Sequence, residues 1–119
     1  IFREFPLGNL AVAAAMLARC VEKQNFFPFI KLLFKQQRAW VTKNPVAPLK
    51  NLAKQAGITE EEFSKCLSNQ AILNGIKQVA TRASKQFGIN ATPTFFINGE
   101  ILLGRRPLAD FEKIMAPYL

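Results

Sequence analysis

The sequence predicts a mostly helical α/β fold, in which a long helical block separates a short first strand from a β-hairpin and a last helix. Two observations predict this order. Apolar residues recur with the helical period from about Asn9 to Phe87. From Thr94 the pattern becomes a short apolar strand, an Asn98-Gly99 turn and a second short strand. Periodicity alone fits either an α/β or an α+β fold with a large helical insert.

Composition narrows the class of protein. The 119 residues allow one domain, with or without an insert. Half of them are hydrophobic, which excludes a disordered tail. No apolar run reaches the ~20 residues of a membrane span. Residues 1–5 lack the pattern of a signal peptide and do not begin with Met, so we expect a piece of a longer protein.

The first elements follow from local patterns. Ile1 to Phe5 carries strand-favouring residues and is closed by a Pro-Leu-Gly turn, which predicts a strand. Asn9 is expected to cap a first helix, and Pro28 to open a second that extends to Trp40. Their inward residues are predicted to be Leu10, Ala13, Leu17, Cys20 and Val21, then Phe29, Ile30, Leu33, Phe34 and Trp40.

Three further helices complete the predicted insert. One lies between Pro45 and Gly57, and Gly57 supplies its left-handed stop. Thr59 to Glu62 forms a capping box that opens the next. Asn69 is expected to cap the fifth, which ends at Gly88. Inward residues are predicted to be Leu49, Leu52, Ala53 and Ala56, then Phe63, Cys66 and Leu67, then Leu73, Ile76, Ala80, Ala83 and Phe87.

The last part of the chain has strand and turn patterns. Thr94 to Ile97 and Glu100 to Leu103 are predicted to pair across the turn. Pro107 suits the first turn of a closing helix. The inward residues of that helix are predicted to be Leu108, Phe111, Ile114 and Met115.

The residue types limit the chemistry. The absence of His removes His triads, His metal sites and His proton shuttles, and two cysteines are too few for a zinc site, so we expect neither metal nor cofactor. Cys20 and Cys66 are too far apart for a Cys-x-x-Cys motif. The residues alone allow three interpretations of these cysteines: a second redox pair, a structural disulfide or two buried free thiols.

The net charge of +8 favours anionic partners or surfaces. Its carriers sit mostly off the apolar stripes, which indicates a solvated face, with lipid headgroups or acidic substrates as the functional alternative. The sequence contains neither a helix-turn-helix pattern nor an aromatic–basic sheet, so it does not indicate nucleic-acid binding. These carriers are Lys31, Lys35, Arg38, Lys43, Lys50, Lys54, Lys77, Arg82 and Lys85. Most of the aromatic residues are expected in the core, with a minority lining a groove near Pro93 as the alternative; they are Phe26, Phe27, Phe29, Phe34, Phe63 and Phe95.

The most informative stretch runs from Phe87 to Gly99, where Pro93 stands between a loop and an apolar strand. Proline is tolerated at a first strand position, which is consistent with an ordinary trans bond. A cis Thr92–Pro93 bond is the functional alternative, because it would leave the Thr92 backbone free to pair with an extended peptide.

This stretch, with Phe87-Gly88-Ile89 before it, resembles the cis-proline segment of DsbA-like thiol–disulfide oxidoreductases, which have a thioredoxin fold. The resemblance spans nearly the whole chain. It implies thioredoxin-fold parts at residues 1–8 (strand) and 89–119 (hairpin and last helix), around a helical insert domain at 9–88. It also implies an α/β class and a cis Thr92–Pro93 bond, with Thr92 and Pro93 binding substrate.

The catalytic Cys-x-x-Cys of that family is not in this chain and is expected upstream of Ile1. The resemblance implies an enzyme that oxidises or isomerises cysteines of exported proteins outside the cytoplasm, with a membrane redox partner. The oxidising location favours a structural Cys20–Cys66 disulfide. The chain alone is expected to be inactive and to pair through exposed strand edges as a homodimer or oligomer. One alternative is a non-catalytic thioredoxin-fold binding module that has lost its cysteines and binds a partner through the cis-proline groove or the basic surface. A more distant one is a glutathione-dependent isomerase or transferase.

Overall fold

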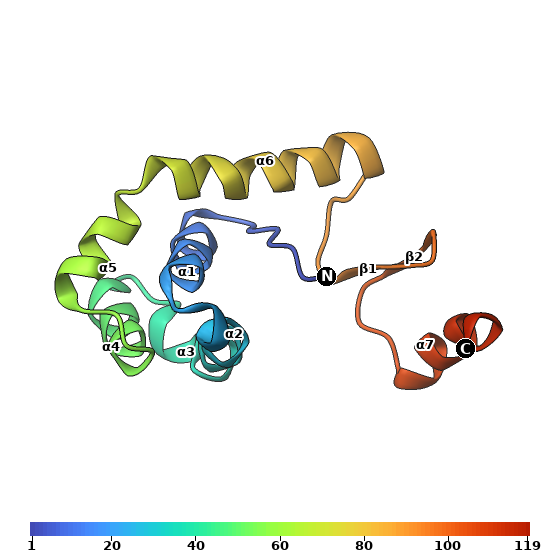
Figure 1. The fold of residues 1–119 in the computed structure, drawn as a ribbon, viewed down its shortest axis with the longest axis horizontal. Coiled ribbons are helices and arrows are strands. Elements are labelled where there is room, and N and C mark those ends of the chain that lie inside the picture. The colour runs from blue at the N-terminus through green and yellow to red at the C-terminus, as the bar shows by residue number, and fades with distance from the viewer. The chain divides into compact units, whose positions relative to one another are not determined.

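A computed structural model describes residues 1–119, which form two compact units, Ile1–Ala80 and Thr81–Leu119. The units meet within one long helix, α6 (Gln70–Phe87). The predicted boundaries at residues 8 and 88 concern the whole thioredoxin fold and stay predictions. Seven α-helices and one two-stranded sheet confirm a mostly helical chain with a C-terminal hairpin (Figure 1).

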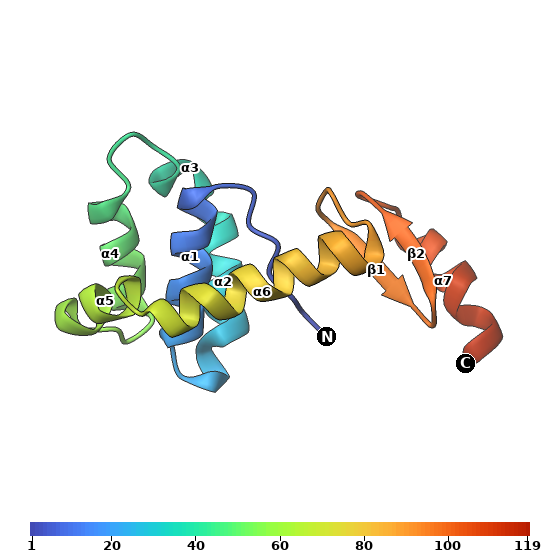
Figure 2. The ribbon, with the colours of Figure 1, turned by 90° about the horizontal axis from the view of Figure 1, so that it is seen from above.

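The first unit is a helical bundle. It contains α1 (Asn9–Cys20), a 3₁₀ turn (Lys23–Asn25), α2 (Phe26–Lys35), α3 (Gln37–Trp40), α4 (Val46–Gln55), α5 (Glu60–Leu67) and the start of α6. Helix α1 contacts both α2 and α5, and α4 contacts α3 and α5 (Figure 2). Alanine, the best helix former, fills the middle of α1, and its small side chains let the neighbouring helices approach closely. None of the helices combines the length and hydrophobicity that spanning a membrane requires.

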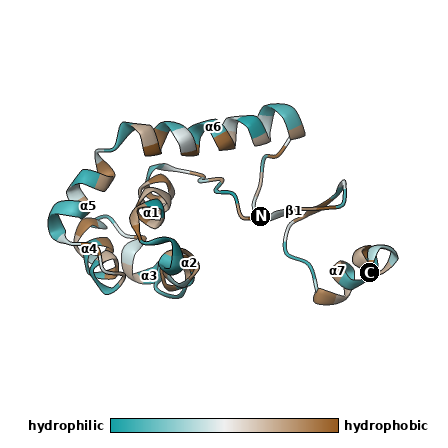
Figure 3. Cartoon of the chain, viewed as in Figure 1, coloured by the Kyte–Doolittle hydropathy of each residue, from teal (hydrophilic) through white to brown (hydrophobic).

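One apolar core holds this bundle together. Leu17 and Ala18 of α1 are fully buried, and Phe29 of α2 is 2% exposed. The Trp40 indole N–H donates to the Leu33 carbonyl at 2.8 Å, which fastens α3 to α2. Other buried members of the core are Met16, Leu33, Leu49, Leu52, Ala53, Ile58, Phe63, Cys66 and Ile76. The apolar colour of α1 in Figure 3 reflects its central place in this bundle.

Several helix signals are confirmed. Thr59 and Glu62 form the complete capping box, with Glu62 N–H donating to Thr59 Oγ1 and Thr59 N–H donating to the Glu62 carboxylate. Asn69 Oδ1 accepts from Ile72 N–H at 3.1 Å at the start of α6. Gly57 follows α4 with a φ of 89°.

The first eight residues contradict the sequence prediction. Ile1–Phe5 is not a strand, because no other strand pairs with it and the only sheet is the hairpin. Gly8, not Asn9, occupies the N-cap of α1. The segment is held instead by its side chains: Glu4 is buried and pairs with Arg19 of α1, while Phe2 packs edge-on against Phe26 and Phe27 of α2.

The predicted second helix is two helices. Helix α2 starts at Phe26, two residues before Pro28, and ends before Gln36, whose φ of −99° and ψ of 17° break the helical path. The insert therefore has six α-helices, not five. Trp40 is buried as predicted, but the expectation that Phe27 and Phe34 lie in the core is wrong, because they are 62% and 66% exposed on the outward side of α2. Val21, predicted on the stripe of the first helix, lies just after α1 in extended backbone.

The second unit contains the end of α6, β1 (Thr94–Ile97), β2 (Glu100–Leu103), α7 (Leu108–Met115) and a final 3₁₀ turn (Ala116–Tyr118). The two strands pair antiparallel, with Thr94 opposite Leu103 and Ile97 opposite Glu100. Asn98 and Gly99 both have positive φ, 47° and 89°, as a two-residue type I′ turn requires. The hairpin prediction is confirmed.

The core of this unit is small. Ile89 and Leu102 are buried, and two edge-to-face aromatic pairs join its elements: Phe95 with Phe111 of α7 at 4.8 Å, and Phe96 with Phe87 of α6 at 5.4 Å. The predictions that Phe87 and Leu108 point inward are wrong, because they are 50% and 69% exposed. Pro107 is the N-cap residue of α7 and lies just before its first turn.

Candidate functional site

The loop before β1 is held at both ends and open in the middle. At its start, Ile89 is buried and its N–H donates to the Ala83 carbonyl at 3.1 Å, which ties it to the end of α6. At its end, the Pro93 carbonyl accepts from Gly104 N–H at 2.8 Å, which ties it to the hairpin. The residues between, 90–93, are exposed. The loop is thus a fixed, solvent-facing segment of backbone.

Thr92 and Pro93 lie in this exposed part, and the peptide bond that joins them is cis. No hydrogen bond within the chain uses the N–H or C=O of Thr92. The neighbouring Thr94 hydroxyl, by contrast, donates to the Ala91 carbonyl at 2.8 Å. Thr92 therefore offers one backbone donor and one backbone acceptor to a ligand.

The outer edge of β1 continues this arrangement. Residues of an antiparallel pair alternate between bonding across the ladder and pointing away from it. Since Pro93 bonds to Gly104, its ladder neighbours Phe95 and Ile97 bond to β2, and the backbone groups of Thr94 and Phe96 point to the opposite edge. No strand pairs with that edge. An extended peptide lying along it would meet unpaired donors and acceptors.

Sequence reasoning did not identify Gly104 as part of this site. Its N–H is the donor that fixes the Pro93 carbonyl. The turn contained the necessary signal, because counting outward from Asn98-Gly99 places residue 93 opposite residue 104.

Cys20 and Cys66 are bonded to each other and lie in the other unit. The bond joins the last residue of α1 to a 3% exposed position in α5, with 6.2 Å between the two Cα atoms. Neither cysteine stands at a helix N-terminus, where a reactive thiolate is stabilised. Because no cysteine is free, this chain holds no thiol for exchange.

Two exposed carboxylates have lowered pKa values, both away from the loop. The hydrogen bond from Lys50 lowers the pKa of Glu60, and the attraction of its charge adds to the effect. The hydrogen bond from the Thr59 backbone lowers the pKa of Glu62 in the capping box. Both effects stabilise the start of α5 and neither bears on a reaction.

A groove of about 490 Å³ lies between β2 and α7. Its lining mixes both signs of charge with apolar residues, and none of it comes from the loop before β1. The lining residues are Glu100, Ile101, Leu102, Arg106, Asp110, Lys113, Ile114 and Pro117.

Comparison with known proteins places this geometry in a family. A family model described as thioredoxin matches residues 1–116. The chain belongs to the thioredoxin family. Within the family, it is 35% identical over 104 residues to a Rickettsia bellii (strain RML369-C) protein named "Putative protein-disulfide oxidoreductase". It is 31% identical over 101 residues to a Rickettsia typhi protein of the same description. These alignments cover 83% of this chain, but only 39% and 37% of the two relatives.

A solved thioredoxin-fold structure agrees. The crystal structure of Wolbachia pipientis alpha-DsbA1 superposes with a TM-score of 0.86 at 28% identity, over 98% of this chain and 66% of that one. The resemblance to DsbA-like proteins and the fold class are therefore confirmed. The chain spans about two-fifths of its curated relatives and two-thirds of the solved neighbour.

Proposed function

We propose that this chain is the substrate-binding part of a thiol–disulfide oxidoreductase that acts on cysteines of exported proteins. The observation that carries the proposal is the Thr92 backbone, exposed and unbonded beside the unpaired edge of β1. Main-chain pairing of this kind binds extended peptides with little sequence preference, as a general oxidoreductase requires. The names of the relatives support the same activity.

The chemistry is assigned to a Cys-x-x-Cys upstream of Ile1. In the oxidising direction, a substrate thiolate attacks one sulfur of the enzyme disulfide, which forms a mixed disulfide and releases the other enzyme sulfur as a thiolate. A second substrate thiolate then attacks the substrate sulfur of the mixed disulfide. The substrate leaves with a new disulfide, and two electrons and two protons stay on the enzyme pair. A membrane redox partner would reoxidise that pair.

The proposal also covers the cellular compartment of the protein and the activity of the 119-residue chain by itself. The Cys20–Cys66 bond supports a compartment outside the cytoplasm, where disulfides persist. Because this chain has no free cysteine, we propose that it is inactive by itself and binds peptide without exchanging disulfides.

The decisive test is the region upstream of Ile1, followed by an assay of the longer chain. A strand–helix–strand unit needs roughly 30 residues. We expect a Cys-x-x-Cys at a helix start there, and a longer chain that oxidises a reduced, unfolded protein while the 119-residue chain does not. A region without a cysteine pair would reject the enzyme and leave a peptide-binding module on the same scaffold. Peptide binding should broaden the amide NMR signals of Thr92, Thr94 and Phe96 in either case.

A further inference from the structure

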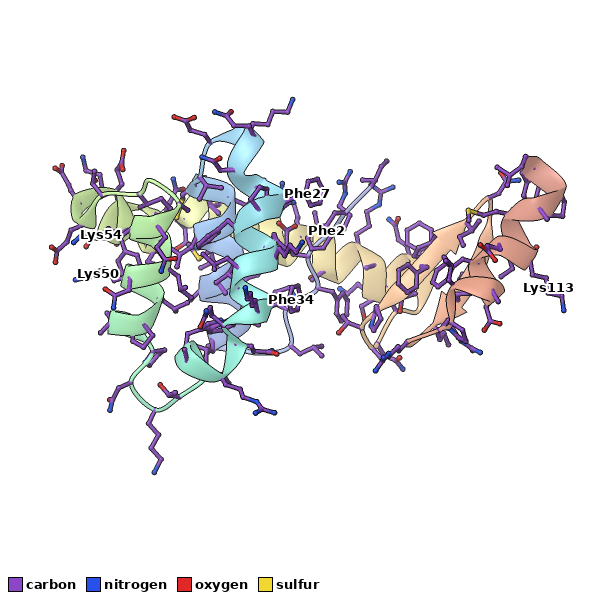
Figure 4. The ribbon with its side chains drawn as sticks, turned by 90° about the horizontal axis from the view of Figure 1, so that it is seen from below. Phe2, Phe27, Phe34, Lys50, Lys54 and Lys113 are labelled. Carbon is purple, nitrogen blue, oxygen red and sulfur yellow. A yellow bond between two sulfur atoms is a disulfide. The ribbon has the colours of Figure 1, made fainter.

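The outward face of α2 carries large apolar side chains in water. Phe27 and Phe34 are 62% and 66% exposed, whereas Phe29 of the same helix is 2% exposed. Figure 4 shows both exposed rings on α2, with Phe2 near Phe27. The helix therefore has a buried apolar face in the bundle and a second apolar strip in solvent. Large apolar side chains exposed together on one helix face indicate a contact surface.

Lysines lie on the same face. Phe27 and Phe34 are seven residues apart, which is two helical turns, so they share a face and stand about 10 Å apart along the axis. Lys31 lies between them in the helix and Lys35 one turn beyond it, and both are exposed. Neither lysine belongs to an ion pair. We call these four side chains, Phe27, Lys31, Phe34 and Lys35, the α2 face.

The surrounding sequence has only one sign of charge. From Lys23 to Thr59 there are seven basic residues and no acidic one, although the chain has eight acids. Arg38 of α3 and Lys43, which lies between α3 and α4, are exposed as well. The segment that carries the α2 face is therefore uniformly basic, which favours an anionic partner that also accepts aromatic rings.

We propose that the α2 face docks on the surface of an anionic phospholipid bilayer. Phenylalanine rings enter the boundary between headgroups and acyl chains, while lysines extend their apolar stems and keep their ammonium groups among the phosphates. The inference does not depend on the proposed oxidoreductase function.

Vesicle co-sedimentation of the 119-residue chain tests this. The probe is vesicles of phosphatidylcholine with about a third phosphatidylglycerol, against pure phosphatidylcholine, at low and high salt. We expect binding to the anionic vesicles only, weakened by salt. Lys31→Gln with Lys35→Gln should lower the partition coefficient about 30-fold, or about fivefold for each lysine. Phe34→Ser should lower it about tenfold.

Matched variants separate this face from general attraction. Lys77→Gln with Lys85→Gln removes the same charge from exposed, unpaired positions of α6, and Leu108→Ser removes a similarly exposed apolar side chain from α7. We expect little change from either. Circular dichroism confirms that each variant is folded.

Four results would overturn the proposal. The first is no binding to anionic vesicles, and the second is an equal loss of vesicle binding in the two double-lysine variants. The third is preference for a polyglutamate peptide over vesicles. The fourth is loss of vesicle binding in a longer chain that includes the region upstream of Ile1. The third would assign the face to an acidic protein. The fourth would assign it to a contact within the longer protein.

Discussion

Reduction of the Cys20–Cys66 disulfide should destabilise the helical unit strongly. The bond closes a loop with a sequence separation of 46, which contains α2, α3, α4 and most of the core. For a loop of that length, the chain-entropy relation gives about 4 kcal/mol at 25 °C. Domains of this size have only about 5–15 kcal/mol of total stability, so the bond supplies a substantial share of that stability.

The measurement compares urea unfolding of the same protein with the disulfide intact and after reduction by dithiothreitol. Reduction changes no side-chain volume, so it isolates the effect of the link from the cavity that a Cys66→Ala change would leave in the core. We expect the free energy of unfolding to fall by about 4 kcal/mol. The m-value should rise, because the unlinked unfolded chain exposes more surface.

A loss below about 1 kcal/mol with an unchanged m-value would refute this reasoning. It would mean that the unfolded chain already keeps α1 and α5 together, so that the bond constrains nothing further. Cys20→Ser with Cys66→Ser provides a second variant that cannot reoxidise during the measurement. Its loss should equal or exceed that of the reduced protein, because it also places a hydroxyl in the core.

Four further predictions concern other parts of the chain. Thr59→Ala should cost about 1 kcal/mol in thermal unfolding, and Thr59→Ser should restore it. The Thr59 backbone N–H lowers the folded pKa of Glu62, so the stability that the Glu62 carboxylate contributes is complete above its ordinary pKa of 4.5 and is lost as the pH falls through the lowered pKa. The stability lost in Glu62→Ala should therefore shrink in acid. Glu4→Gln should cost about 1–3 kcal/mol by leaving Arg19 without its carboxylate, whereas Glu112→Gln on an exposed, unpaired site should cost almost nothing. The isolated chain should self-associate through the open edge of β1, so that its sedimentation coefficient rises with concentration and Phe96→Lys lowers that rise; a concentration-independent monomer would contradict this.

The sequence predicted best those elements whose signals are local. The Thr59 capping box, the Asn98-Gly99 turn and the stop at Gly57 each depend on a few adjacent residues, and each is confirmed. Ile1–Phe5 could not be predicted correctly from its own composition, because a strand exists only by pairing with another. Phe34 failed for a related reason, since α2 has apolar residues on two sides and only packing against the other helices decides which side is buried.

The sequence also predicted only part of the candidate site. Thr92 and Pro93 were identified by resemblance, and their exposure depends on the loop being held at Ile89 and Gly104. The Cys20–Cys66 pairing stayed open from the residues alone, because spacing does not specify a bond between distant helices.

The buried indole of Trp40 makes the two units distinguishable in solution. It is the only tryptophan of the chain and it belongs to the first unit, while the single tyrosine, Tyr118, belongs to the second. Intrinsic tryptophan emission therefore reports on the helical bundle and is silent about the hairpin. A denaturant titration followed by this emission and by the NMR signals of the hairpin would show whether the two units melt together or separately.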